Sequence, residues 1–144
     1  MDTENENIRM IIFRINETVM AVDSALVREI LKDNSIYRLP FVPDYVEGMI
    51  NYHGEPFTVV RLEKTDDLVF LVFKLDGDDL SLRISEILSF CDWDGKYIEE
   101  TETEIEIKDD RFSSGAFMYN GKPVSVLDVN KLDWNLKKDL GWKK

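Results

Sequence analysis

The feature that most constrains this chain is an internal repeat. Residues 48–60 (GMINYHGEPFTVV) align without a gap on residues 115–127 (GAFMYNGKPVSVL), at an offset of 67 (115 − 48). A glycine, a tyrosine, a second glycine, a proline and a valine occupy shared positions in the two segments. One explanation is that two hairpins have converged on the residues that their turns require. The other is that the chain contains two similar units.

A weaker repeat favours the second explanation. Residues 13–15 (FRI) correspond to residues 73–75 (FKL) at an offset of 60, and residues 29–31 (EIL) correspond to residues 86–88 at an offset of 57. The order of these segments is the same in both halves. Each half then consists of a hairpin, a Glu-Ile-Leu segment and a second hairpin, which predicts two similar small barrels packed into one unit.

Apolar runs and turn residues predict four hairpins and two helices. The hairpins are expected to pair residues 10–15 with 19–22, 48–52 with 57–62, 68–75 with 80–84, and 115–119 with 124–127. A short helix is expected after the first hairpin, capped by Asp23 or Ser24, with the apolar residues of the segment 26–31 on one face. A longer helix is expected to start at Asp128. Pro40 and Pro43 predict an extended connector over residues 39–43.

The charge of the chain restricts its partners. With 18 Lys and Arg against 29 Asp and Glu, the net charge is −11, which disfavours nucleic acid and anionic membrane surfaces. The chain begins with acidic and polar residues, unlike a signal peptide, and its one cysteine excludes a disulfide framework, so we expect a cytoplasmic protein. The acid is concentrated in the head, in turns and in Glu99–Asp110, whereas residues 39–42 and 49–52 are uncharged. We expect protein partners to dock on these charge-poor segments.

Motifs for catalysis, phosphate or metal are missing. A phosphate-binding loop starting at Gly115 would need glycine where Asn120 stands, and a calcium loop starting at Asp76 would need glutamate where Ile87 stands. With one histidine and one cysteine, a zinc cluster is excluded, and the only nucleophilic dyad would be Cys91 with His53, for which there is no orienting motif. The acidic residues 99–106 are interpreted as a solvated strand face, with Ile105 and Ile107 turned inward. We therefore expect no enzyme, and a small hydrolase would need a concave polar site that these residues do not provide.

Two segments carry a resemblance to a known family. Residues 27–31 (VREIL) and 39–54 (LPFVPDYVEGMINYHG) resemble the CheW family of bacterial chemotaxis coupling proteins. That family carries a V-x-E-I segment, a Pro-x-x-Pro connector that leads into a strand ending in asparagine, and an N-x-R-G turn. Residues 71–90 and 126–128 resemble later strands of the same family, so the resemblance covers nearly all of the chain.

The resemblance implies a fold and a function. The expected fold is mainly β, with two small five-stranded SH3- or OB-like barrels, a short helix after the first hairpin and a C-terminal helix. Residues 1–8 would be a flexible acidic head, and residues 9–144 one domain of two intertwined barrels. The implied function is a non-enzymatic adaptor, without cofactor or metal, that links the cytoplasmic tips of chemoreceptors to the regulatory domain of a CheA-type histidine kinase. It would act in the cytoplasm at receptor arrays, without membrane insertion and without binding nucleic acid.

The resemblance also suggests two sets of binding residues. Receptor helices would contact Val27, Glu29, Gly48, Asn51 and His53 in the groove between the barrels. The kinase would contact Ile36, Leu39, Phe41, Val42, Tyr45 and Phe57, the last as the start of the hairpin strand 57–62. The alternative is a divergent small β-barrel module that binds a protein or peptide outside the chemotaxis array.

One departure from the family bears on receptor binding. The arginine of the N-x-R-G turn is His53 here, which removes a permanent cation that can pair with the glutamate of V-x-E-I, here Glu29. In the strand that follows the turn, Thr58 and Arg61 replace a proline and an acid. If His53 meets Glu29, protonation of the imidazole near neutral pH would strengthen the pair and make receptor binding sensitive to pH.

Overall fold

The four expected hairpins are present in the computed structural model, which describes residues 7–99 and 112–141. The elements in chain order are β1 (Ile8–Ile15), β2 (Thr18–Asp23), the 3-10 helix η2 (Ser24–Leu26), β3 (Val27–Lys32), β4 (Tyr37–Arg38), β5 (Val46–Tyr52), β6 (Glu55–Val60), β7 (Val69–Phe73), β8 (Leu80–Ile84), β9 (Glu86–Trp93), β10 (Ser113–Tyr119), β11 (Lys122–Leu127) and α1 (Val129–Asp139). Residues 1–6 of the predicted acidic head, most of the strand face at 99–106 and the last two lysines lie outside the described residues, and Ile8, which was placed in the head, starts β1.

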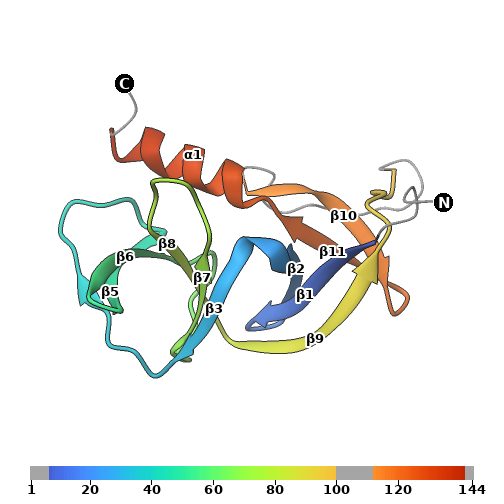
Figure 1. Ribbon diagram of the computed structural model, residues 1–144, viewed down its shortest axis with the longest axis horizontal. Helices are drawn as coiled ribbons and strands as arrows, with labels where there is room; N and C mark the ends of the chain where they lie inside the picture. Colours follow the sequence, from blue (N-terminus) through green and yellow to red (C-terminus); the bar gives the residue numbers. More distant parts are fainter. Residues whose placement is uncertain (1–6, 100–111, 142–144) are drawn as a thin grey trace.

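The strands form two sheets, each of which curls into a small barrel (Figure 1). Barrel 1 has the strand order β10-β11-β2-β1-β9, and barrel 2 has the order β3-β7-β8-β6-β5-β4. The two-barrel prediction is confirmed. Barrel 2 has one strand more than expected, because Tyr37 and Arg38 pair with Met49 and Gly48 as a short edge strand.

The barrels exchange a strand. The chain leaves hairpin β1–β2 of barrel 1 and enters β3, which pairs with β7 of barrel 2. It later leaves hairpin β7–β8 of barrel 2 and enters β9, which pairs with β1 of barrel 1. Each barrel therefore contains an edge strand that continues the other barrel's hairpin, and the two units are intertwined.

The short helix expected after the first hairpin is limited to one 3-10 turn. Asp23 caps it as predicted, because its side chain accepts a hydrogen bond from the Ala25 amide at 2.9 Å. The helix prediction is wrong from Val27 onward, where the chain forms β3. The reason is that both faces of this strand are covered: Ile30 packs on the core between the barrels and Leu31 on the interior of barrel 2. Apolar residues on both faces of a short strand imitate the spacing of one helical face.

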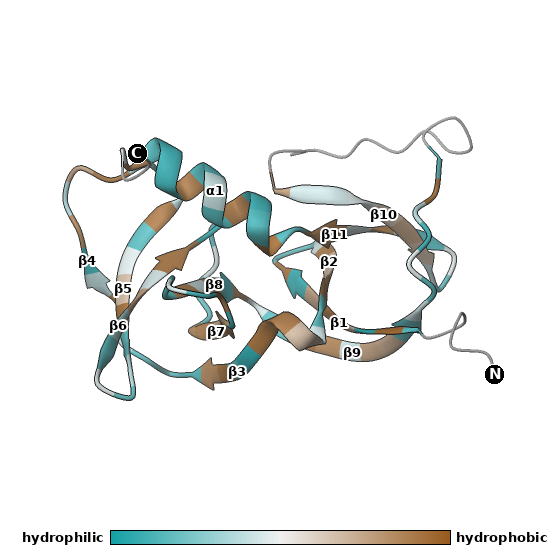
Figure 2. Ribbon diagram, turned by 45° about the horizontal axis from the view of Figure 1, so that its top comes forward, coloured by the Kyte–Doolittle hydropathy of each residue, from teal (hydrophilic) through white to brown (hydrophobic). Residues whose placement is uncertain are grey.

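The core has three parts. The largest, the inter-barrel core, combines strands of both barrels with Val129, Leu132 and Leu136 of α1. Separate clusters fill barrel 1, around Trp93 and Phe117, and barrel 2, around Tyr52 and Phe57. Figure 2 shows the alternation of hydrophobic and hydrophilic residues along α1, which starts beside β11 and extends over barrel 2. The helix begins after Asp128, whose side chain accepts from the Lys131 amide at 3.0 Å, as the sequence predicted.

The repeat at offset 67 has a structural basis. Hairpins β5–β6 and β10–β11 each carry a bulge immediately before the first glycine of the repeat, and both glycines, Gly48 and Gly115, have φ near +150°. Each hairpin turns through a residue with φ of 51°, His53 or Asn120, followed by glycine. Each second strand, β6 or β11, then pairs in parallel with β8 or β2. The two hairpins are equivalent parts of two equivalent barrels.

Candidate functional site

A cluster of polar side chains joins β3 to the β5–β6 turn on barrel 2. The hydroxyl of Tyr52 donates a hydrogen bond to Oε1 of Glu29 at 2.8 Å, and Nε2 of His53 lies 3.7 Å from the same oxygen. The rings of Tyr52 and His53 meet edge to face, with centroids 4.4 Å apart. Two predicted receptor contacts, Glu29 and His53, are thus brought together by a tyrosine that the prediction did not include.

The sequence contained a signal for Tyr52. It is the tyrosine of the repeat, and a tyrosine at the same position in both halves indicates a structural task that both barrels share. Glu29, by accepting the hydrogen bond of the hydroxyl, raises the pKa of Tyr52, and burial and the charge of Glu29 act in the same direction. The positive charge of Arg28 lowers it and is outweighed.

The other predicted receptor contacts, Asn51, Val27 and Gly48, contribute to the local structure around this cluster. Asn51 is exposed, and its side chain accepts a hydrogen bond from the Gly54 amide at 2.8 Å, which closes the turn below His53. Val27 is half-buried against the inter-barrel core. Gly48 is buried, and a Cβ at this position would lie 2.1 Å from the carbonyl oxygen of Tyr37. Gly48 therefore allows β4 to approach β5 and offers no side chain to a partner.

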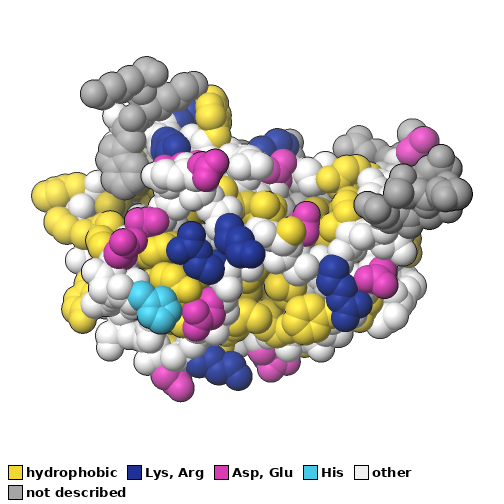
Figure 3. Space-filling model, viewed as in Figure 1, with side chains coloured by type: hydrophobic (Ala, Val, Ile, Leu, Met, Phe, Trp, Pro, Cys, Tyr) yellow, Lys and Arg dark blue, Asp and Glu magenta, His cyan; other side chains and the backbone are white. Residues whose placement is uncertain are grey.

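The connector, which extends to residue 44 in the structure, presents apolar side chains to solvent at the end of barrel 2. Leu39 is exposed, Tyr37 just before it is 63% exposed, and Phe41 is 103% exposed with a φ of 59°. The prediction included Leu39 and Phe41 but missed Tyr37. In Figure 3, hydrophobic side chains (yellow) project at the left edge of the molecule, and the histidine (cyan) lies among acidic and basic side chains on the same face.

The rest of the predicted kinase-binding residues are less accessible. Ile36 and Val42 are half-buried, against the barrel 2 core and the inter-barrel core. Phe57 is only 1% exposed, because its side chain points into barrel 2 and packs edge to face on Tyr52. The expectation that Phe57 contacts a partner is therefore corrected: together with the buried Thr58, Val59 and Val60, it supports the surface from inside.

Both ends of the connector are anchored. At its start, Arg38 lies 3.6 Å from the carboxylate of Glu47, which is almost fully buried and receives two hydrogen bonds from Nη1 of Arg83, at 3.0 and 2.8 Å. At its end, the hydroxyl of Tyr45 donates to Oδ2 of Asp139 on α1 at 2.5 Å, and the Arg61 amide donates to the Tyr45 carbonyl at 2.7 Å. These contacts fix the positions of the two ends of the connector.

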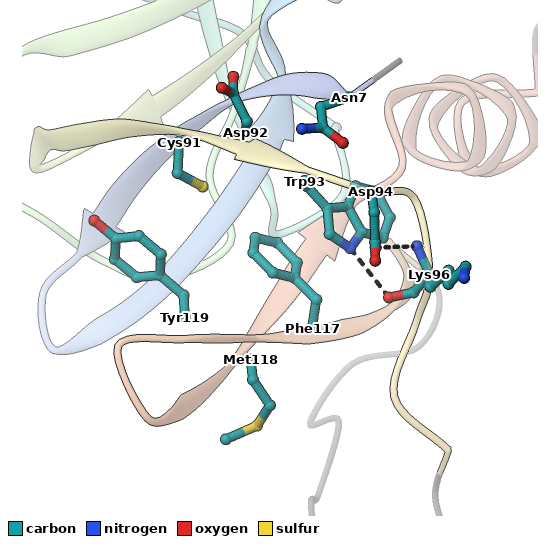
Figure 4. Close-up of a pocket in the computed structure, with 9 residues that line it drawn as sticks. All are labelled: Asn7, Cys91, Asp92, Trp93, Asp94, Lys96, Phe117, Met118 and Tyr119. Atoms are coloured by element: carbon teal, nitrogen blue, oxygen red, sulfur yellow. Dashed lines mark hydrogen bonds between the residues drawn. The ribbon is translucent and has the colours of Figure 1, made fainter. Parts of the chain in front are cut away.

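Barrel 1 contains pockets beside the corresponding hairpin. One, of about 420 Å³, is lined by residues that include Cys91, Trp93, Phe117 and Tyr119 (Figure 4). Burial, with the negative charge of Asp92, raises the pKa of the Cys91 thiol, which disfavours the nucleophilic thiolate. Cys91 lies in barrel 1 and His53 on the far hairpin of barrel 2, so the dyad considered from the sequence belongs to two different barrels.

Within residues 7–99 and 112–141, no three His, Cys, Asp or Glu side chains are grouped so that they could hold a metal ion. Over the same residues, no helix has the length and apolar character needed to span a membrane.

Comparisons with known proteins agree with one another. The sequence model of the CheW-like domain family matches residues 9–134. A curated relative, "Chemotaxis protein CheW" of Treponema pallidum, is 30% identical over 148 residues, which cover 92% of this chain and 85% of the relative. A solved structure, the scaffolding protein TtCheW from Thermoanaerobacter tengcongensis, has the same fold with a TM-score of 0.74, at 22% identity over 85% of each chain.

Proposed function

Since the chain belongs to the CheW-like domain family, we propose that it is a non-catalytic adaptor that couples chemoreceptors to a CheA-type histidine kinase in chemotaxis arrays. The relative from Treponema pallidum is named as a chemotaxis protein and TtCheW as a scaffolding protein, which supports the adaptor role. The cytoplasmic tip of a receptor would bind at the Glu29–Tyr52–His53 cluster. The regulatory domain of the kinase would bind at the connector 39–44.

The observation that carries the proposal is the exposure of Phe41. A phenylalanine whose side chain is entirely in water, on a backbone with φ of 59°, gives up hydrophobic burial and accepts backbone strain. The anchors at Glu47 and at Tyr45 maintain this arrangement in the free protein. An exposed aromatic residue next to Leu39 and Tyr37 is the kind of side chain that dominates the binding energy of protein interfaces.

Two binding measurements test the proposal. Titration calorimetry with a CheA-type regulatory domain should give binding that is weakened at least tenfold by Phe41→Ala, with a smaller loss for Leu39→Ala. The same two variants should bind a fragment of a chemoreceptor tip as the unmodified protein does. Glu29→Ala should give the opposite pattern, with weakened receptor binding and unchanged kinase binding.

A matched control comes from barrel 1. Leu88 is 43% exposed and Leu39 is 38% exposed, so Leu88→Ala removes the same group from a comparable surface outside the connector. It should leave kinase binding unchanged. If the folded, unmodified protein binds neither partner, the chain is not such an adaptor, and the reading as a barrel module with other partners takes its place.

His53 contacts Glu29 at the proposed receptor site. Its Nε2 lies 3.7 Å from Oε1 of Glu29, and its ring meets that of Tyr52 edge to face. His53→Asn, which introduces the residue found at the equivalent turn, removes the imidazole from this contact. It should weaken binding of the receptor fragment and leave kinase binding unchanged.

A further inference from the structure

The C-terminal end of α1 is hydrogen-bonded to the end of the connector. The hydroxyl of Tyr45 donates to Oδ2 of Asp139, the last residue of α1, at 2.5 Å. The ring of Tyr45 packs on the buried Phe112, with centroids 5.4 Å apart. In Figure 2, the chain that leaves β4 passes beside this end of α1. The side chain of Tyr45, which the family resemblance placed among the kinase contacts, is therefore engaged with α1 and the inter-barrel core.

Further hydrogen bonds fix the backbone around Tyr45. The Val46 amide donates to the Pro43 carbonyl at 2.9 Å, and the Arg61 amide donates to the Tyr45 carbonyl at 2.7 Å. The guanidinium of Arg61 also donates to the carbonyl of Asp44, at 3.3 Å. Because these bonds hold the turn together, a shift of Tyr45 relative to α1 would move the connector that precedes it.

Asp139 is an unfavourable residue for its place in the helix. The last turn of an α-helix carries a partial negative charge, which favours lysine and disfavours aspartate. Lys137 and Lys138 follow this preference, and Asp139 contradicts it. A residue that contradicts the local preference indicates a tertiary contact that compensates for it, and the hydroxyl of Tyr45 supplies that contact.

The exposed conformation of the connector is unfavourable by itself. Phe41 is fully exposed with a φ of 59°, so both apolar burial and the relief of backbone strain favour other positions for it. Only three residues separate Phe41 from Tyr45, so the contact of Tyr45 with α1 limits these other positions. A partner that binds Phe41 binds more weakly when the connector spends only part of its time in the exposed position.

The other side of α1 provides a contrast. Nζ of Lys137 lies 2.6 Å from Oδ2 of Asp78 in the β7–β8 turn. Residues two positions apart lie on nearly opposite sides of an α-helix, so Lys137 and Asp139 point to different neighbours. The Lys137 contact joins α1 to the β7–β8 turn, whereas the Asp139 contact joins it to the connector.

We infer that Asp139 and Tyr45 are positioning residues for kinase binding, and that the end of α1 holds the connector so that Phe41 stays exposed. This inference rests on the proposed function. Neither Asp139 nor the hydroxyl of Tyr45 has to touch the kinase, because both act through the position of Phe41. The helix that follows barrel 1 in the chain thus contributes to a binding surface on barrel 2.

Titration calorimetry with a CheA-type regulatory domain tests the inference. Tyr45→Phe keeps the ring and removes the hydroxyl, and it should weaken binding about fivefold, the size expected for the loss of one hydrogen bond. Asp139→Leu should weaken binding by the same factor, and the double variant should bind no more weakly than either single variant. Asp139→Asn retains an oxygen that accepts from the Tyr45 hydroxyl, so it should bind as the unmodified protein does.

Lys137→Gln is the matched control, because it removes the ionic contact on the other side of the same helix. It should lower the melting temperature without changing the affinity for the kinase. All of these variants should bind a chemoreceptor-tip fragment as the unmodified protein does. This pattern distinguishes a displaced connector from a general loss of structure.

The outcomes separate the inference from the proposed function. If Phe41→Ala weakens kinase binding and Tyr45→Phe or Asp139→Leu does not, the inference is wrong and the proposed function stands. Equal losses for Asp139→Asn and Asp139→Leu, losses that add in the double variant, or an equal loss for Lys137→Gln would each overturn the inference as well. If the unmodified protein does not bind the regulatory domain, both are wrong.

Discussion

Barrel 1 and barrel 2 share a backbone arrangement, here called the frame, and differ in the side chains that this frame carries. The frame consists of a bulged hairpin with a glycine near φ +150°, a two-residue turn, a parallel pairing of its second strand and a tyrosine that reaches the exchanged strand. Barrel 2 adds a buried ion pair, the contact between Glu29 and His53, and an apolar connector. The comparison teaches that few residues maintain the architecture and that different ones distinguish the surfaces.

The largest expected difference in stability between equivalent substitutions in the two barrels is at the bulge before the repeated glycine. Glu47 is paired with the buried Arg83, whereas its equivalent on barrel 1, Ser114, makes a hydroxyl contact of 2.8 Å with Tyr97. Glu47→Ala should lower the free energy of unfolding by about 3–5 kcal/mol, because it leaves the charge of Arg83 buried without its partner. Ser114→Ala should cost about 1 kcal/mol or less. Urea unfolding measures both, and equal costs would contradict the assigned role of the ion pair.

The second largest difference is expected for alanine substitutions at the repeated glycines, Gly48 and Gly115. Both have a positive φ, so alanine is strained at either position. At Gly48 the new Cβ would meet backbone, 2.1 Å from the Tyr37 carbonyl oxygen, whereas at Gly115 it would meet the side chain of Tyr97, 2.6 Å away, which can rotate. Gly48→Ala should lower the free energy of unfolding by about 3 kcal/mol, and Gly115→Ala should lower it by about 1–2 kcal/mol. These values lie near the two ends of the range for local backbone strain. Thermal unfolding tests the order, and a larger loss for Gly115→Ala would reverse the interpretation.

The tyrosines at the repeated position, Tyr52 and Tyr119, provide a smaller contrast. Tyr52→Phe removes the hydrogen bond to the carboxylate of Glu29, and Tyr119→Phe removes the contact of 2.5 Å with Oγ of Ser89. We expect Tyr119→Phe to lower the free energy of unfolding by about 1 kcal/mol, and Tyr52→Phe to lower it more, because its partner is charged.

The Tyr52 contact should also depend on alkaline pH. The hydrogen bond to Glu29, followed by burial, raises the pKa of Tyr52, so the folded state holds the phenolic proton more tightly than the unfolded state. The stabilisation is complete below the unfolded value of about 10 and is lost as the pH rises through the folded value. Unfolding curves at pH 8 to 11 should show that Tyr52→Phe lacks this decline. An unchanged decline in the variant would exclude Tyr52 as its source.

The smallest expected effect concerns α1, which follows barrel 1 in the chain and forms an ion pair with the β7–β8 turn of barrel 2. Nζ of Lys137 lies 2.6 Å from Asp78 in the β7–β8 turn and 3.3 Å from Asp133 on the helix. Burial, the hydrogen bond with Asp78 and the charge of Asp78 raise the pKa of Asp133, and Lys137 opposes them. The folded state therefore favours protonated Asp133, and the associated stability, present at acid pH, is lost as the pH rises through the raised value.

Asp133→Asn should consequently stabilise the protein at pH 7, by less than about 1 kcal/mol, with little effect near pH 4. Asp76→Asn removes the same charge from an exposed position in the turn that contains Asp78, and it serves as the control. Melting temperatures at pH 4, 5, 6 and 7 measure the difference. A gain that does not grow with pH would show that Asp133 is not the titrating group.

Much of this structure follows from local signals in the sequence. The four hairpins, the Asp23 and Asp128 caps and the two-unit organisation are determined by turn residues, capping side chains and the repeat, which act over a few neighbouring positions. The binding residues that came from family resemblance form two groups on barrel 2, around Glu29 and around Phe41. Their roles remain predictions that the binding experiments test.

Tertiary structure alone decided the rest, because contacts between distant segments choose among locally equivalent possibilities. Val27–Lys32 forms a strand because β7 and two cores lie around it, and β3 and β9 exchange barrels, which no local pattern encodes. Phe57 turned inward, and Tyr52 became the link between Glu29 and His53. The repeat in the sequence indicated two similar units. The packed structure determined that their shared tyrosine joins the two exchanged strands, and that only one of the two junctions is charged.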